Sequence, residues 1–230
     1  MSTAAAILAE LRANATTEDR KKTSDRLPDG YPLFGVRMKT TFDLAKAHAA
    51  MPLAEVAALF GEPEYEARLC AVCVLDFKAR SPRLGDDERR AGYELYLTRH
   101  DRIDTWDMVD RAAPRVVGQY LMDRPHDPLF ALARSANPHE RRTAITAPLY
   151  WARYGTPAHL PDLFRLAGLL AADEDVVVSK PVGISLKYAG LLDEPALLSF
   201  LDTHAANLPR PALSYAVEKL PPPLRVKYRG

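Results

Sequence analysis

The feature that most constrains the fold is the helical spacing of apolar residues along nearly the whole chain. Apolar positions recur every three or four residues, in segments that Pro, Gly or Asp residues separate. Runs of consecutive β-branched residues, which are typical of strands, are nearly absent apart from Val176–Val178. The predicted fold class is therefore all-α, with helices near residues 3–19, 40–50, 53–60, 63–79, 87–99, 105–122, 127–135, 138–154, 161–171, 174–190, 193–206 and 209–219.

Several of the predicted helix ends have a local chemical signature. Asn137 is a suitable N-cap, and Pro138 follows it at the first helical position. Prolines and glycines within residues 20–39 predict a connecting segment between an N-terminal helix, residues 1–20, and the rest of the chain. The three prolines at 221–223 are expected to end the last helix.

A weak internal repeat predicts how these helices are arranged. Segments that begin at Glu64, His139 and Glu174 each place acidic residues before a basic residue and then an apolar helix. Their spacing is compatible with helical hairpins of the HEAT type, at about 40 residues per repeat. We expect one HEAT-like domain over residues 1–230, a helical-repeat solenoid or α–α superhelix. A concave face of such a stack can follow a DNA duplex, although solenoids also bind proteins.

The composition excludes several classes of protein. With 47% hydrophobic and 27% charged residues, the chain is typical of a globular domain. No apolar run approaches the roughly 20 residues that cross a bilayer, so neither a membrane span nor a signal peptide is predicted. Cys70 and Cys73 lack a second pair or a histidine cluster, which favours core packing over zinc. Free thiols fit a reducing, cytoplasmic location. No phosphate-binding loop or nucleophile motif is present, and no metal or cofactor is predicted.

The formal net charge of +1 gives little general support for nucleic-acid binding, because Lys and Arg contacts to phosphates supply most non-specific affinity. The distribution of charge matters more than the total. Basic residues gather at 20–22, 141–142 and 225–229, whereas acidic residues gather at 86–88 and 173–175. A surface with one basic side is compatible with this pattern, as is an ordinary solvated one.

The candidate site lies in the segment 104–110, at the start of a long predicted helix. Trp106 and Asp110 are spaced i, i+4, so an aromatic face and a carboxylate share one side of the helix and suit a positively charged reaction centre. The ordinary alternative is a partly buried Trp beside an acid at a helix start. The positive helix end explains Asp107, in the first turn, but not Asp110. Asp110 therefore needs a specific partner, either Arg142 or a cationic ligand.

Basic residues on the following predicted helices are the candidates for DNA contacts. Arg142 shares its direction with Arg153 and is the better candidate to face a groove, whereas Arg141 points toward the apolar side of its helix. Lys180 and Lys187 extend a possible basic stripe along the next repeat. For Arg142, a salt bridge between neighbouring repeats is an equal alternative.

Four segments together resemble a known family: Phe34–Arg37, Thr105–Asp110, Ser135–Asn137 with Arg141–Ile145, and Lys180–Lys187. In order and spacing they are similar to the bacterial AlkD-type DNA alkylation repair proteins, which are HEAT-like-repeat DNA glycosylases. The similarity runs from about residue 30 to the C-terminus.

The resemblance implies an enzyme that hydrolyses the N-glycosidic bond of cationic N3- or N7-alkylated purines in double-stranded DNA. Asp110 matches the catalytic Asp of the family, Trp106 the Trp that stacks on the sugar-phosphate, and Arg142 an Arg that contacts DNA. An alkylated purine is already a good leaving group, so the main task is to stabilise an oxocarbenium-like sugar. A carboxylate does so electrostatically, and an aromatic face adds cation–π attraction.

The chain departs from the family pattern in one segment. Ile184 stands where the family has an aromatic residue that forms a second wall of the site, and Pro181 comes shortly before it. Two alternatives to the glycosylase follow. One is a non-catalytic relative that binds damaged or branched DNA, which Ile184 favours. The other is a protein-interaction scaffold, which the charge of +1 favours.

Overall fold

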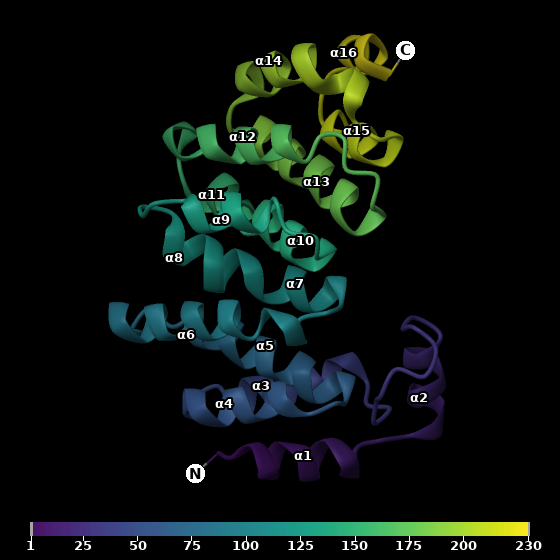
Figure 1. Ribbon diagram of the computed structural model, residues 1–230, viewed down its shortest axis with the longest axis vertical. Coiled ribbons are helices and arrows are strands. Elements are labelled where there is room, and N and C mark those ends of the chain that lie inside the picture. Colours follow the sequence, from purple (N-terminus) through teal and green to yellow (C-terminus); the bar gives the residue numbers. More distant parts are fainter. Residues whose placement is uncertain (1, 230) are drawn as a thin grey trace. The chain divides into compact units, whose positions relative to one another are not determined.

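The computed structural model describes residues 2–229, and every regular element within them is helical, with no β-strand (Figure 1). The all-α prediction is thus confirmed. The helices form two compact units, one ending at Asp104 and one beginning at Thr105. No helix among the described residues is both long and apolar enough to cross a bilayer.

The first unit is built around one buried helix, α5. Helices α3 and α4 pack against α5, as does α1, and Cys70 and Cys73 lie fully buried in it, as expected for core residues. Burial raises the pKa of the Cys70 thiol, which keeps it protonated. The elements of this unit are α1 (Ala4–Ala13), α2 (Thr17–Ser24), α3 (Met38–Ala47), α4 (Leu53–Gly61), α5 (Tyr65–Ala79), α6 (Asp86–Thr98) and the short 3-10 helix η1 (His100–Arg102).

A buried carboxylate orders the loop before α3. Glu66, on α5, accepts hydrogen bonds from the backbone N–H groups of Phe34, Gly35 and Val36 at 2.8–3.0 Å. Gly35 has φ +97°, and a Cβ added there would lie 2.5 Å from the Cβ of Arg20. The loop therefore requires glycine at this position, for conformation and for space.

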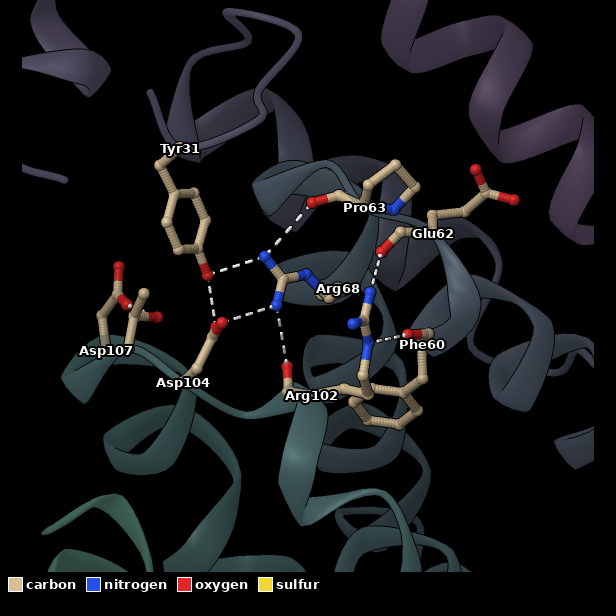
Figure 2. Close-up of polar contacts among 9 residues, drawn as sticks. Tyr31, Phe60, Glu62, Pro63, Arg68, Arg102, Asp104 and Asp107 are labelled. Atoms are coloured by element: carbon tan, nitrogen blue, oxygen red, sulfur yellow. Dashed lines mark hydrogen bonds and ion pairs between the residues drawn. The ribbon is translucent and has the colours of Figure 1, made fainter. Parts of the chain in front are cut away.

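A buried arginine closes the same unit (Figure 2). Arg68, on α5, donates to the carboxylate of Asp104 at 2.8 Å, to the hydroxyl of Tyr31 at 2.6 Å and to the carbonyl of Pro63 at 3.2 Å. The hydroxyl of Tyr31 in turn donates to the other carboxylate oxygen of Asp104. The two terminal nitrogens of Arg68, the hydroxyl of Tyr31 and the carboxylate of Asp104 thus each have a partner on the protein, whereas the buried Nε of Arg68 has none within residues 2–229.

The second unit is organised around α13, which contacts helices α10, α11, α12, α14 and α15. Gly183, near its middle, is needed for close packing, because a Cβ there would lie 2.1 Å from the carbonyl oxygen of Ala212 on α15. The elements are α7 (Trp106–Ala112), the π-helical segment η2 (Ala113–Gly118), α8 (Gln119–Leu121), α9 (Asp127–Leu132), α10 (Pro138–Thr146), α11 (Leu149–Tyr154), η3 (Pro157–His159), α12 (Pro161–Leu169), α13 (Val176–Leu192), α14 (Glu194–His204), η4 (Ala205–Asn207), α15 (Arg210–Ala216) and α16 (Pro222–Arg229).

The predicted helix over 105–122 is present but changes its winding in the middle. The segment Ala113–Gly118 is π-helical and contains Pro114, which has no N–H and whose ring would clash with the carbonyl of Asp110 in a regular helix. The wider π turn accommodates this proline. The irregularity begins three residues after Asp110, where α7 ends.

Three helix predictions were wrong in their limits. The single N-terminal helix over residues 1–20 is two helices, α1 and α2, and α2 extends into the expected connecting segment 20–39. Residues 138–154 also form two helices, because Pro148 interrupts the pattern. The prolines at 221–223 do not end a helix: α15 already ends at Ala216, and α16 begins among the prolines, as suits proline in a first turn.

Candidate functional site

The start of α7 presents an aromatic side chain and a carboxylate to solvent. Trp106 is the first residue of α7 and is 54% exposed, while the side chain of Asp110, one turn later, is 38% exposed. Both lie beside fully buried residues, Met108 and Val109, which fix this helix against the core. The i, i+4 spacing therefore gives the shared exposed face that the sequence predicts.

Asp110 is paired with Arg142 in a two-pronged salt bridge. The Nε and a terminal nitrogen of Arg142, on α10, donate to the two carboxylate oxygens at 2.8 and 2.7 Å. The guanidinium also lies 5.8 Å from the centre of the Trp106 ring. The three residues predicted to form the site are thus brought together by α7 and α10. The arrangement also matches the alternative of a salt bridge between two repeats.

A proline on α13 contributes to the position of Arg142. The third bond of its guanidinium goes to the backbone carbonyl of Val177, in the first turn of α13. In a regular helix this carbonyl accepts from the N–H four residues later, but that residue is Pro181, which has none. The proline leaves the carbonyl of Val177 available to Arg142.

The carboxylate of Asp110 lines a pocket of about 240 Å³ that lies entirely within the second unit. Four elements supply its walls: Asp110, Pro114 and Arg115 come from the α7–η2 segment, Arg142 and Thr146 from α10, Leu149, Tyr150, Arg153 and Tyr154 from α11, and Pro181 and Ile184 from α13. The walls carry three arginines and one carboxylate, so the pocket favours an anionic ligand overall while presenting a negative group at one point.

Helix α11 supplies aromatic rings that our sequence analysis missed. Tyr154 is 55% exposed, and its hydroxyl accepts a hydrogen bond from Arg115 at 3.0 Å. The Arg115 guanidinium lies 5.9 Å from the ring centre of Tyr150 and 5.4 Å from that of Tyr154. The i, i+4 spacing of the two tyrosines was the available signal. They place aromatic surface in the pocket that Ile184 also lines.

The other predicted DNA-binding residues lie outside this pocket. Arg141 pairs with Asp173 at 2.7 Å and donates to the carbonyls of Ser135 and Ala136, so it joins two loops of the second unit. Lys187 pairs with Glu218 at 3.0 Å, whereas Lys180 is exposed. Among residues 2–229, no group of three or more His, Cys, Asp and Glu side chains is placed to hold a metal ion.

Comparison with known proteins decides the family. The model of the family described as "DNA alkylation repair enzyme" matches residues 7–220. The chain belongs to this family. Membership gives it a role in DNA alkylation repair with DNA as substrate, and it confirms the resemblance found in the sequence.

A solved structure confirms the helical-repeat fold. The chain is similar to a predicted DNA alkylation repair enzyme from Enterococcus faecalis, with a TM-score of 0.68 and 16% sequence identity over 91% of this chain and 98% of the other. No curated protein matches the sequence. The HEAT type of the repeats, the single-domain organisation and the cytoplasmic location stay predictions.

Proposed function

We propose that this protein is a DNA glycosylase that hydrolyses the N-glycosidic bond of cationic N3- or N7-alkylated purines in duplex DNA. The observation that carries the proposal is the exposed carboxylate of Asp110, in a pocket and next to the exposed ring of Trp106. An alkylated purine leaves readily, so the catalytic requirement is a negative charge near the sugar, where positive charge develops.

The salt bridge with Arg142 is compatible with this role. An ionised carboxylate has about four acceptor sites, and Arg142 uses one on each oxygen. The remaining sites are available to an oxocarbenium-like sugar or to the attacking water. The bridge also holds the carboxylate in one orientation before the substrate binds, which is how a site lowers the reorganisation needed at the transition state.

Trp106 supplies the second component of the proposed mechanism. Its exposed ring, at the edge of the Asp110–Arg142 pair, can stack on the sugar-phosphate of the damaged strand and attract the cationic nucleoside. Since Ile184 lines the pocket where an aromatic residue is expected, the tyrosines of α11 are the aromatic side chains in its walls, and Trp106 lies beside Arg142.

A specific observation favours a second candidate, a non-catalytic protein that binds damaged or branched DNA. Arg142 donates to both oxygens of Asp110, so its charge opposes that of the carboxylate at short range. In this case the pocket binds DNA and releases no base.

The deciding experiment is release of 7-methylguanine and 3-methyladenine from methylated duplex DNA, with DNA binding measured in parallel. We expect release by the wild type and a loss of about 100-fold in Asp110→Asn with binding retained. Asp107→Asn is the matched control, because Asp107 lies on the same helix but does not line the pocket, and its carboxylate accepts from the hydroxyl of Thr105 and the backbone N–H of Met108. If the wild type binds DNA without releasing base, the result would favour the second candidate. If it neither binds DNA nor releases base, the result would favour the protein scaffold.

A further inference from the structure

Three arginines line the pocket, and a DNA strand bound there brings phosphate groups to it. Arg115, Arg142 and Arg153 are chemically equivalent but differ in what already surrounds them. Phosphate binding needs a guanidinium with free N–H groups that face solvent. The surroundings of Arg142 and Arg153 therefore show which of these two meets the DNA.

Arg142 is already committed to the protein. Three of its five N–H groups are used, two by Asp110 and one by the carbonyl of Val177, and its side chain is only 7% exposed. A turn toward a phosphate would leave the carboxylate without its donors and the Val177 carbonyl without the donor that Pro181 cannot replace. Its contacts suit a residue that holds Asp110 in place.

Arg153, on α11, has the opposite environment. It is exposed, and within residues 2–229 it makes no ion pair, so no carboxylate neutralises its charge. Its guanidinium lies 4.6 Å from the centre of the Tyr188 ring. Contact with a ring face restricts the side chain while its N–H groups stay available at the edge of the guanidinium plane.

We propose that Arg153 binds a backbone phosphate of the DNA strand, and that Arg142 is a positioning residue that acts through Asp110. The first half depends only on DNA binding. The second half rests on the proposed glycosylase activity, so the two are measured separately. The proposal moves the phosphate contact from Arg142, which the family resemblance implies, to a residue on the next helix.

The first measurement is binding of an undamaged duplex as a function of salt concentration, for Arg153→Gln, Arg142→Gln and Arg134→Gln. The last is the charge-matched control, because Arg134 is exposed, lies outside the pocket and donates to the carbonyl of Phe130 in its own helical turn. The slope of log K against log salt is negative, and loss of one phosphate contact reduces its magnitude by about 0.9. We expect this decrease in Arg153→Gln and an unchanged slope in the other two variants.

The second measurement is single-turnover base release at saturating enzyme. Arg142→Gln is expected to release base at least about tenfold more slowly although it binds DNA as the wild type does, because Asp110 is no longer fixed. Arg142→Lys keeps the charge but cannot bridge both oxygens, so it is expected to be slow as well. It also serves as the second variant if Arg142→Gln does not fold, which circular dichroism reports. Arg134→Gln, a change outside the pocket, should release base at the wild-type rate.

The outcomes are separable. A salt slope for Arg153→Gln equal to that of Arg134→Gln overturns the assignment of Arg153 as the phosphate ligand. A salt slope for Arg142→Gln that is smaller in magnitude by about 0.9 overturns the positioning role of Arg142. A wild type that releases no base, with the slopes ordered as expected, supports Arg153 as the phosphate ligand and rejects the glycosylase alone.

Discussion

Two arginine–aspartate pairs, one in each unit, are built almost identically and differ in what faces the aspartate. In the first unit Arg68 has a side chain that is 4% exposed and pairs with Asp104, which is 39% exposed. In the second unit Arg142 and Asp110 have values of 7% and 38%. Each arginine lies against an aromatic ring, 5.0 Å from the centre of Tyr31 and 5.8 Å from that of Trp106.

The difference lies in the remaining acceptor sites of each carboxylate. The hydroxyl of Tyr31 donates to the oxygen of Asp104 that Arg68 leaves free, so protein groups contact both carboxylate oxygens (Figure 2). At Asp110 the aromatic neighbour is Trp106, an indole whose exposed ring leaves the outer side of the carboxylate to the pocket. A buried arginine with a half-exposed aspartate is therefore a structural element in one place and a candidate site in the other.

The largest expected difference is in stability when each arginine is truncated. Arg68→Ala should cost about 3 kcal/mol in free energy of unfolding, because Tyr31, Pro63 and Asp104 all lose a buried donor. Arg142→Ala should cost about half as much, since water in the pocket can reach Asp110. Equal costs would contradict the distinction between a closed pair, Arg68–Asp104, whose carboxylate is contacted by protein groups on both oxygens, and an open pair, Arg142–Asp110, whose carboxylate faces the pocket.

Urea unfolding can assign each loss to its unit. Both tryptophans, Trp106 and Trp151, belong to the second unit, so tryptophan fluorescence reports that unit, whereas circular dichroism reports helices in both. Arg68→Ala should shift the circular dichroism transition ahead of the fluorescence transition. Coincident transitions in this variant would show that the two units unfold together.

The second prediction concerns the backbone carbonyls that each arginine uses. Arg68 takes the carbonyl of Pro63, outside a helix, whereas Arg142 takes that of Val177, inside α13 and free because of Pro181. In Pro181→Ala the new N–H competes for the Val177 carbonyl, and Arg142 holds Asp110 less firmly. We expect base release to slow by about tenfold, equal to about 1.4 kcal/mol, without loss of stability.

Pro195→Ala is the matched control, because Pro195 lies in the first turn of α14, where proline replaces no helical hydrogen bond. Its release rate should equal that of the wild type. An unchanged rate of base release in Pro181→Ala would show that Pro181 does not contribute to the position of Arg142.

The sequence predicted the functional side chains on α7 better than it predicted the contacts that other helices make with them. Trp106 and Asp110 follow from helical periodicity, and Arg142 from its direction on the next predicted helix. The bond between Arg142 and Val177 could not be predicted, because it depends on how α13 packs beside α10. Tyr154 was missed for a similar reason. One continuous helix was predicted over 138–154, but a separate helix starts after Pro148, so the directions of the side chains beyond Pro148 were not predicted correctly.

The closed pair was the least predictable of these features. Glu66 and Arg68 read as an ordinary charged helix start, yet both are buried, since each satisfies a loop that is distant in sequence. Local patterns predict helices, but they do not show which charges a loop will cover. The distinction between the two pairs therefore comes from the structure alone.

The smallest predicted effect tests whether Tyr31 is what closes the first pair. Tyr31→Phe removes a donor to Asp104 and an acceptor for Arg68, which should cost about 1 kcal/mol at neutral pH. Burial raises the pKa of the Tyr31 hydroxyl, and the bond to Asp104 raises it further against the opposing effect of Arg68. The unfolded chain releases this proton near pH 10, so the stabilisation is present below that pH and is lost as the pH rises above it. Urea unfolding at pH 7 and above pH 10 should therefore show a difference between wild type and variant that shrinks with pH, whereas a constant difference would mean that the hydroxyl proton is not held by the network.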